Sequence, residues 1–421
     1  MTSLSLLLWI ASGVVLQLAI YLGIVFWRHW LDYQALRSGA AGPNLSTAQE
    51  VPTAAEKTSV SAWPGFRTFR VGRKVVEDAA QSVCSLYLVP EDGQTLPAFL
   101  PGQFLTFRLD VPGTAGGSEP IVRCYSLSDA PHPDYYRISV KRAPSPAGGD
   151  VPPGRSSNYI HDQVAVGSLL QVRAPSGHFH IDRSAVPVVL IGGGIGITPM
   201  LSMLNWCLAE QPGREVWLFY GVRHGRELVM KSHLQALAAA HANLHLRLCF
   251  SDPLPEDMAG RDYQHRGRVD LALLRMLLPL KPYHFYVCGP TPMMESLVTA
   301  LEDWGVPEAR IHFEAFGPAS IKRKQATTGA TLAATDPRIV VTFAQSGKQV
   351  PWQPAAGSLL EFAEANGIAV DYGCRAGGCG SCQTTILAGE VAYRQAPDYD
   401  PEPGTCLLCV SAPKTSVTLE V

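Results

Sequence analysis

The sequence predicts a multidomain chain with one N-terminal transmembrane helix, an antiparallel β-barrel, a doubly wound α/β domain and a smaller β-rich C-terminal domain. Three observations predict this order. The chain opens with an apolar run, continues with short β-type runs between Gly and Pro turns, and then alternates strands with helices from Val186 onward. A length of 421 residues corresponds to two to three domains, which agrees with this division.

The composition excludes some classes of protein. The chain carries 34 Lys and Arg against 36 Asp and Glu, so it has no positive excess with which to neutralise nucleic-acid phosphates. Hydrophobic residues make up 47% and charged residues 17%, which favours buried cores over disorder. We therefore expect no nucleic-acid partner.

The apolar run covers residues 4–27, and Gln17 is its only strongly polar side chain. A helix of this length spans the hydrocarbon core of a membrane. Arg28 and Arg37 follow the run, while no Lys or Arg precedes it, which predicts an outside N-terminus and domains that face the cytoplasm. We therefore expect a single-pass protein of the cytoplasmic membrane. A cleaved signal peptide is the alternative, although it would favour a basic start and a shorter apolar stretch.

Two stretches of small polar residues and prolines are typical of flexible linkers and divide the rest of the chain. The predicted segments are an anchor at 1–37, a linker at 38–62, a β-barrel at 63–185, an α/β domain at 186–320, a linker at 321–336 and a β-rich domain at 337–421. Within the α/β domain, strands and helices alternate at the spacing of a parallel sheet covered on both faces.

A glycine-rich turn follows the first predicted strand of the α/β domain and leads into a helix. Glycines let the backbone approach a pyrophosphate closely, and the helix N-terminus offers free N–H groups and a positive dipole end. The residues of this turn are Gly192, Gly193, Gly194, Gly196, Thr198 and Pro199. The spacing is not that of the Rossmann motif, so an ordinary βα turn is the alternative.

A second turn, Cys288, Gly289 and Pro290, follows the last predicted strand of the same sheet. Ligands of open α/β sheets bind beyond the carboxyl ends of the strands, where both turns fall. We therefore expect the two turns to meet over one ligand, although a single Cys after a strand is also common as packing.

Two further motifs lie in the predicted barrel. Arg123 can pair with a phosphate, Tyr125 can lie against a planar ring, and Ser126 can hydrogen-bond a ring nitrogen. About thirty residues later, Ser157 and Asn158 precede an apolar run and predict a helix N-cap that suits a phosphate.

The ten cysteines are unevenly distributed, because five of them fall in the last fifty residues. Cys374, Cys379 and Cys382 have the C-x4-C-x2-C spacing of plant-type two-iron clusters, and Cys409 follows 27 residues later. The alternative is a zinc ribbon built from two C-x2-C pairs, Cys379 with Cys382 and Cys406 with Cys409. That ribbon leaves Cys374 without a role.

The motifs RCYS, GRSSNYIH, GGGIGITPM and VCGPTPMM occur in this order. Together they resemble the ferredoxin–NADP reductase superfamily, in particular reductases of the phenylacetyl-CoA-epoxidase, flavohaemoglobin and phthalate-dioxygenase kinds. The resemblance implies that Arg123, Tyr125 and Ser126 contact the flavin. It also implies that the helix at Ser157 and Asn158 receives the FAD pyrophosphate. FMN is the alternative flavin, because the phthalate-dioxygenase-reductase branch uses it.

The same resemblance assigns the remaining site residues. Thr198 and Cys288 would hold the nicotinamide nucleotide, and Glu314 and Phe316 would close the site beside the flavin. The implied catalytic residues are Ser126, Cys288, Glu314 and Phe316. The context LLCVSAP resembles that of the fourth ligand in ferredoxins, which selects Cys409 over Cys406 and implies a β-grasp fold.

Coenzyme choice stays open at this point. Arg223, Arg226 and Lys231 follow the second strand of the α/β domain, where the 2′-phosphate of NADPH is read, but a solvated basic helix start explains them equally well. NADH and NADPH are both compatible with the sequence.

The expected function is a membrane-anchored reductase that passes electrons from NAD(P)H through FAD and a 2Fe–2S cluster to a protein acceptor. A membrane-associated oxygenase, hydroxylase, demethylase or desaturase is the first choice of acceptor, since a tether raises the effective concentration of the two partners. The alternatives are a direct quinone or ferric reductase and a non-catalytic membrane scaffold with a zinc ribbon.

Overall fold

The fold is described from a computed structural model. It describes residues 62–63, 65–113, 117–145, 152–316, 339–353, 357–375, 377–394, 397, 399 and 401–421, with the isolated positions 17 and 23. The predicted transmembrane helix at 4–27 otherwise lies outside the described residues, as does the predicted linker at 321–336. Within the described ranges, no helix has both the length and the apolar character needed to cross a membrane.

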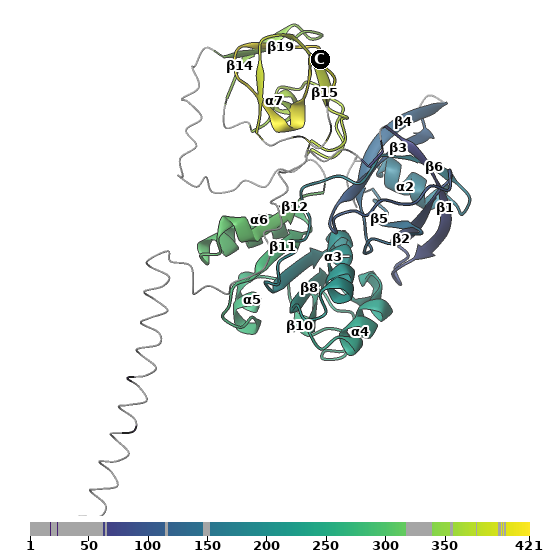
Figure 1. Ribbon diagram of the computed structural model, residues 1–421, viewed down its shortest axis with the longest axis vertical. Helices are drawn as coiled ribbons and strands as arrows, with labels where there is room; N and C mark the ends of the chain where they lie inside the picture. The colour runs from purple at the N-terminus through teal and green to yellow at the C-terminus, as the bar shows by residue number, and fades with distance from the viewer. Residues whose placement is uncertain are drawn as a thin grey trace, which may run out of the picture. The chain divides into compact units, whose positions relative to one another are not determined.

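The first part of the chain forms a curled antiparallel sheet of six strands in the order β4-β3-β6-β1-β2-β5 (Figure 1). The elements are β1 (Arg67–Val76), β2 (Val83–Pro90), β3 (Phe104–Pro112), β4 (Ser118–Ser126), β5 (Tyr136–Lys141), α2 (Arg155–Asp162) and β6 (Leu169–Val172). A single antiparallel bridge between Leu127 and Ile138 joins the two edges of the sheet. The curl encloses a core that includes Phe69, Leu86 and Phe107, so alternate strand residues point inward. We refer to this part as the flavin barrel after its predicted ligand.

The second part is a parallel sheet in the order β10-β9-β8-β7-β11-β12. Its strands are β7 (Val188–Gly193), β8 (Val216–Val222), β9 (Leu244–Phe250), β10 (His265–Arg266), β11 (His284–Cys288) and β12 (Ile311–Glu314). Its helices are α3 (Ile197–Glu210), α4 (Lys231–Ala240), α5 (Leu271–Leu277) and α6 (Thr291–Asp303). Val188 and Leu190 of β7 pack in the core that contains α3 and α4, whereas Val189 and Ile191 pack in the core that contains α5 and α6. The sheet is therefore doubly wound, as predicted.

The C-terminal part is a mixed five-stranded sheet in the order β14-β13-β19-β15-β17, with a separate pair of β16 and β18. Its elements are β13 (Val340–Phe343), β14 (Lys348–Pro351), α7 (Leu359–Ala365), β15 (Gln383–Ala388), β16 (Val391–Tyr393), β17 (Thr405–Leu407), β18 (Ser411–Pro413) and β19 (Val417–Leu419). Helix α7 begins with a capping box, because Ser358 accepts from the Glu361 N–H and Glu361 accepts from the Ser358 N–H. Its apolar side packs on the sheet through Leu359, Leu360 and Phe362.

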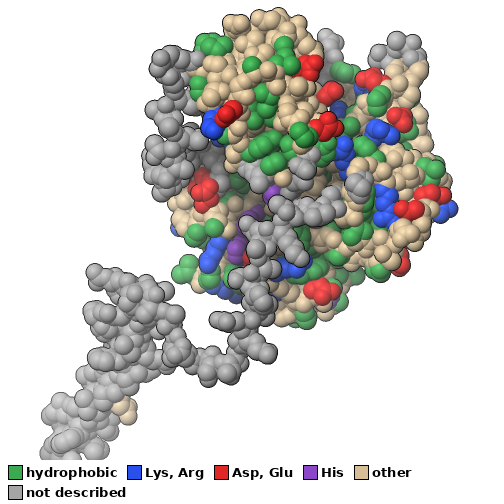
Figure 2. Space-filling view, turned by 45° about the horizontal axis from the view of Figure 1, so that its top comes forward, with side chains coloured by type: hydrophobic (Ala, Val, Ile, Leu, Met, Phe, Trp, Pro, Cys, Tyr) green, Lys and Arg blue, Asp and Glu red, His purple; other side chains and the backbone are tan. Residues whose placement is uncertain are grey.

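The surface agrees with the balanced charge of the sequence. On the face seen in Figure 2, Lys and Arg side chains are interspersed with Asp and Glu side chains.

Candidate functional site

The two glycine turns meet at the carboxyl ends of β7 and β11, which are neighbouring strands. A Cβ atom on Gly196 would lie 2.2 Å from the carbonyl oxygen of Cys288, and one on Gly193 would lie 2.8 Å from Pro290. Strand β7 pairs with β8 on one side and with β11 on the other, so the turns sit at the point where the strand order reverses. The predicted meeting of the two turns is confirmed.

The turn after β7 also leads into a helix as predicted. Helix α3 begins at Ile197, which places Thr198 and Pro199 in its first turn. Pro199 costs no intrahelical hydrogen bond at this position, because the first N–H groups of a helix have no such partner. The Thr198 hydroxyl donates to the carbonyl of Ile195, 3.0 Å away.

Three of the four predicted catalytic residues come together. Cys288 on β11 is the register partner of both Gly192 on β7 and Glu314 on β12. The hydroxyl of Ser126, at the end of β4, donates to the Glu314 carboxylate over 3.4 Å. Residues from the barrel and the parallel sheet, nearly 190 positions apart in sequence, therefore share one site. Phe316 lies two residues beyond Glu314 and is 40% exposed.

The surroundings of this site disfavour negative charge. Burial raises the pKa of Glu314 to about 8, with a further rise from Cys374, while the Ser126 hydrogen bond opposes the shift. Burial also raises the pKa of the Cys288 thiol well above its ordinary value, and Glu314 adds to that rise. The carboxyl group and the thiol are therefore both protonated at neutral pH, so each can donate a hydrogen bond.

The flavin motif lies on β4. Tyr125 is largely enclosed, packs its ring against Phe107 at 5.6 Å, and has a pKa raised by burial. Arg123 points to the exposed side and donates to the carbonyl of Val122. The exposed Arg123 can pair with a flavin phosphate, and the enclosed Tyr125, two positions later, can lie against the planar flavin ring.

The prediction that Ser157 and Asn158 cap helix α2 is wrong. The N-cap residue is Gly154, and the helix begins at Arg155, so both side chains lie inside the first turns. Asn158 donates to the carbonyls of Ala143 and Gly154, which fastens the helix start to the preceding segment. The N–H of the cap residue Gly154 donates to the Ala143 carbonyl over 2.9 Å. Ser157 and Asn158 remain at the amino end of the helix.

The cysteine loop is built to present sulfur atoms to a cluster. The N–H of Gly378 donates to the Cys374 sulfur, and the N–H of Cys374 donates to the Cys379 sulfur, each over 3.2 Å. A Cβ on Gly373 would lie 2.8 Å from the Cys379 sulfur, and Gly377 has a φ of +76°. Glycine is needed at these positions because the backbone wraps closely around the thiols.

Side-chain contacts run from Cys382 to Cys409, from Cys409 to Cys374 and from Cys374 to Cys379. In the part of the chain that the structure describes, no three His, Cys, Asp or Glu side chains are arranged to hold a single metal ion. The four linked cysteines, Cys374, Cys379, Cys382 and Cys409, are the ligand set of a 2Fe–2S cluster, in which two irons share four cysteines. The loop therefore fits this cluster.

Cys406 does not join this group. It lies on β17 opposite Thr384, is completely buried, and has a pKa raised to about 11 by burial. Its packing among apolar side chains agrees with the choice of Cys409 rather than Cys406 as the fourth ligand.

Two side chains near the cluster loop have contacts that the sequence did not predict. Cys124, the second residue of the RCYS motif, contacts the thiols of Cys374 and Cys379. Arg173, just after β6, donates to the Cys379 carbonyl over 2.8 Å. No local pattern marks either residue, because the role of each depends on a contact more than 200 residues away in sequence.

The basic residues after β8 have mixed roles. Arg223 and Arg226 line a cavity of about 550 Å³ at the carboxyl end of that strand, together with Glu227. Arg223 forms an ion pair with Glu227, and Lys231 instead pairs with Asp262 over 2.8 Å. Two of the three cations are therefore already paired with carboxylates.

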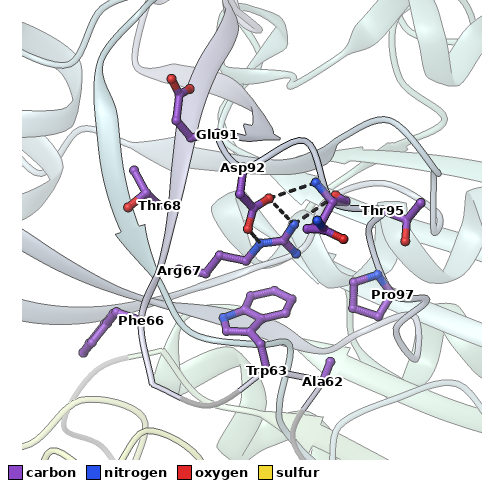
Figure 3. A pocket seen from close by; sticks show the side chains of 10 residues that line it. Ala62, Trp63, Phe66, Arg67, Thr68, Glu91, Asp92, Thr95 and Pro97 are labelled. Atoms are coloured by element: carbon purple, nitrogen blue, oxygen red, sulfur yellow. Dashed lines mark hydrogen bonds and ion pairs between the residues drawn. The ribbon is translucent and has the colours of Figure 1, made fainter.

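A larger cavity, of about 840 Å³, lies at the start of β1 (Figure 3). Arg67 extends into it between the Trp63 ring and Asp92, and its guanidinium is bonded to both carboxylate oxygens of Asp92. Because Arg67 is already paired with Asp92, this cavity has no free cation of its own among the described lining residues. The functional site therefore lies where the two glycine turns, Ser126 and Glu314 meet.

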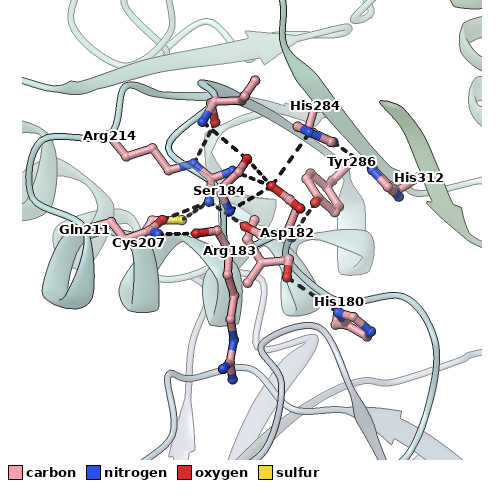
Figure 4. A network of polar contacts seen from close by, with 12 residues as sticks. His180, Asp182, Arg183, Ser184, Cys207, Gln211, Arg214, His284, Tyr286 and His312 are labelled. Atoms are coloured by element: carbon pink, nitrogen blue, oxygen red, sulfur yellow. Dashed lines mark hydrogen bonds and ion pairs between the residues drawn. The ribbon is translucent and has the colours of Figure 1, made fainter. Parts of the chain in front are cut away.

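A polar cluster at the opposite, amino ends of β11 and β12 is structural (Figure 4). His284 and His312 are joined by a 3.1 Å hydrogen bond, and the Tyr286 ring stacks on His312 at 4.5 Å. Burial and the neighbouring His284 lower the pKa of His312 to about 4. The two imidazoles therefore pack toward the amino ends of these strands, whereas Cys288 and Glu314 lie at the carboxyl ends.

Three family models match the chain. The oxidoreductase FAD-binding domain matches residues 80–181, the oxidoreductase NAD-binding domain matches 190–299, and the 2Fe-2S iron-sulfur cluster binding domain matches 341–414. The matches lie within the predicted segments, confirm FAD, NAD(P)H and a 2Fe–2S cluster as ligands, and exclude the zinc-ribbon scaffold.

Relatives and solved structures agree. A flavohemoprotein of Halalkalibacterium halodurans is 40% identical over 258 residues, which are 61% of each chain. The flavohem-like FAD/NAD-binding domain of a nitric oxide dioxygenase from Vibrio cholerae is 35% identical, with a TM-score of 0.53, over 60% of this chain and all of that one. Phthalate dioxygenase reductase is 27% identical, with a TM-score of 0.50, over 85% of this chain and 98% of that one.

The fold and the site define a modular oxidoreductase that joins flavin-, nicotinamide- and iron–sulfur-binding domains. The chain belongs to the ferredoxin–NADP reductase-like family of iron–sulfur flavoproteins. It spans about 61% of the length of the flavohemoprotein that it matches.

Proposed function

We propose that the protein is the electron-transfer reductase of an oxygenase-type system, which takes electrons from NAD(P)H and passes them through FAD and a 2Fe–2S cluster to an acceptor. One observation carries this proposal. The cluster loop contacts the flavin barrel directly, at Arg173 and at Cys124 of the flavin motif. Electron donor and electron acceptor sites within one chain are thereby brought into contact.

The geometry of the site indicates what the cofactor and the protein side chains each contribute. Bound FAD would supply the conversion between the two-electron chemistry of the nicotinamide and the one-electron chemistry of the iron–sulfur cluster. The turns at Gly193 and Gly196 provide the close backbone approach that the nucleotide needs. Ser126 and Glu314 stand where the flavin's reactive edge is expected, and their hydrogen bond keeps the two side chains aligned.

The acceptor is proposed to be a membrane-associated oxygenase, hydroxylase, demethylase or desaturase. Phthalate dioxygenase reductase has a modular structure for electron transfer from pyridine nucleotides to [2Fe-2S], and its similarity over 85% of this chain supports an oxygenase partner. The apolar run at 4–27 supports an anchor in the cytoplasmic membrane with the domains on the cytoplasmic side. Confinement to one membrane would raise the effective concentration of the partners.

Deletion of residues 1–37 tests this proposal. We expect the truncated protein to leave the membrane fraction and to reduce a small soluble acceptor as fast as the full chain. Turnover of the native acceptor in membranes should fall by at least tenfold, and an unrelated transmembrane helix fused in place of 1–37 should restore it. Unchanged turnover in membranes after the deletion would contradict the anchored acceptor.

A further inference from the structure

Arg173 lies between the flavin barrel and the cluster loop. Its backbone N–H donates to the Thr106 carbonyl of β3 over 2.8 Å, which fixes its position on the barrel. Its guanidinium donates to the carbonyl of Cys379, a cluster ligand, over 2.8 Å. The side chain thus joins a rigid strand to the loop that holds the iron.

Aromatic rings cover the guanidinium of Arg173. The Phe66 ring centroid lies 4.7 Å away and that of Tyr399 lies 4.8 Å away. Tyr399 belongs to the loop side, because its N–H donates to the Gly377 carbonyl and its ring would contact a Cβ on Gly380 at 2.7 Å. In the described part of the chain, the buried Nε atom of Arg173 has no hydrogen-bond partner.

A second contact shows that the loop approaches the barrel closely. The Ser176 hydroxyl donates to the Gly378 carbonyl over 3.4 Å. A Cβ on Gly378 would lie 3.0 Å from the Phe104 ring and 3.1 Å from the Ser176 hydroxyl. The approach therefore depends on glycine at this position.

A fixed positive charge beside a cluster has a predictable effect. A 2Fe–2S cluster with four thiolates is anionic, and it gains one further negative charge when one iron is reduced from Fe³⁺ to Fe²⁺. A guanidinium that stays protonated stabilises the reduced form more than the oxidised form. Because aromatic rings limit solvent around this cation, the interaction is screened less than it would be in open water.

We propose that Arg173 is a positioning residue for electron transfer, which holds the cluster loop against the flavin barrel at Cys379 and raises the reduction potential of the cluster. The inference rests on the flavin-to-cluster order of the proposed function, but not on the acceptor or on the membrane anchor. It concerns a single electron that leaves the reduced flavin and enters the cluster.

The test compares the full-length holoprotein with its Arg173→Gln variant. After rapid mixing with NADH, flavin reduction should remain within twofold of the wild-type rate, while the following reduction of the cluster should slow by at least tenfold. A redox titration followed by electron paramagnetic resonance should show a tenfold shift toward the oxidised cluster, which is about 59 mV for a one-electron couple.

Arg108→Gln is the matched control. Arg108 also stacks on Phe66, at 5.1 Å, but it lies on the exposed side of β3. It should keep both the wild-type rate and the wild-type potential. Arg173→Lys keeps the charge without the planar group, so it should recover most of the potential and little of the rate.

Tyr399→Leu provides a second variant in case Arg173→Gln loads its cluster poorly. This substitution removes one of the two aromatic rings that cover the Arg173 guanidinium. It should increase amide exchange in the segment 377–383 and slow cluster reduction by at least threefold. Wild-type potential and wild-type cluster reduction in Arg173→Gln would overturn the proposal. If that variant lacks its cluster, wild-type amide exchange and wild-type cluster reduction in Tyr399→Leu would overturn it. Failure of the membrane acceptor assay would leave this result unaffected, since no acceptor is present.

Discussion

Glu314 illustrates how the properties of one residue depend on its neighbours. In the sequence it is an ordinary glutamate within HFEAF, and only the family resemblance marked it. In the structure it lies beside Cys288 and accepts from Ser126, and burial raises its pKa to about 8. The native state therefore keeps a proton that the unfolded chain releases near its ordinary pKa of 4.5.

This shift predicts a pH-dependent stability. Between pH 4.5 and about 8 the unfolded state ionises while the native state does not, so the contribution of Glu314 to stability should fall as the pH rises. Glu314→Gln should remove this loss, on the order of 1 to 3 kcal/mol. The measurement is thermal unfolding of both proteins at pH 5 and pH 8.5.

Glu295→Gln is the control, because Glu295 is exposed on α6. It should melt like the wild type at both pH values. Equal pH dependence of wild type and Glu314→Gln would contradict a protonated carboxyl group at neutral pH.

At the scale of elements, the strands and helices with clear periodicity were predicted well. The strand at Val188–Gly193 and helices α3 and α7 lie where their patterns indicated. The strand is buried on both faces, as its continuous apolar run indicates. The predicted cap at Ser157 was wrong because the helix begins at Arg155, with Gly154 as its N-cap. The Ser358 capping box of α7, by contrast, follows the residue preference for caps.

The junction of two elements gives the second prediction. A methyl group on Gly196 would lie 2.2 Å from the Cys288 carbonyl oxygen. Because this oxygen belongs to the backbone, the main chain of one of the two turns would have to move to relieve the clash. Gly196→Ala should therefore displace the two nucleotide turns and raise the KM for NAD(P)H by at least tenfold, with a stability loss of about 1 to 3 kcal/mol. Steady-state kinetics and thermal unfolding measure both effects.

Gly213→Ala, in the turn before β8, is the corresponding control. Its added methyl group would meet nothing within 4 Å, so KM and stability should both stay near the wild type. A wild-type KM in Gly196→Ala would show that the turns do not bind the nucleotide.

At the scale of the whole molecule, the C-terminal domain has an apolar core of its own, formed by residues from Val341 onward. The barrel and the parallel sheet are joined more closely, because Val83 of β2 packs in the core that contains α3 and α4. Loss of the cluster should therefore leave the flavin and nicotinamide sites folded.

Cys409→Ser tests this independence. The variant should lose its cluster iron and its reduction of one-electron protein acceptors, while NADH still bleaches the flavin at a rate within twofold of wild type. Cys406→Ala should keep the cluster and lose about 1 kcal/mol of stability, because Cys406 only packs in the core. Iron content and visible absorption distinguish the two variants. A cluster that survives in Cys409→Ser but not in Cys406→Ala would reverse the ligand assignment.

The sequence by itself determined the modular order and the ligand types, because strand and helix periodicity, glycine turns and cysteine spacing are local signals. Only the tertiary structure decided which side chains share a site. Ser126 meets Glu314, and Arg173 meets Cys379, through contacts across 188 and 206 residues. Such contacts arise when separately folded cores pack together, and neither residue type nor spacing encodes them locally.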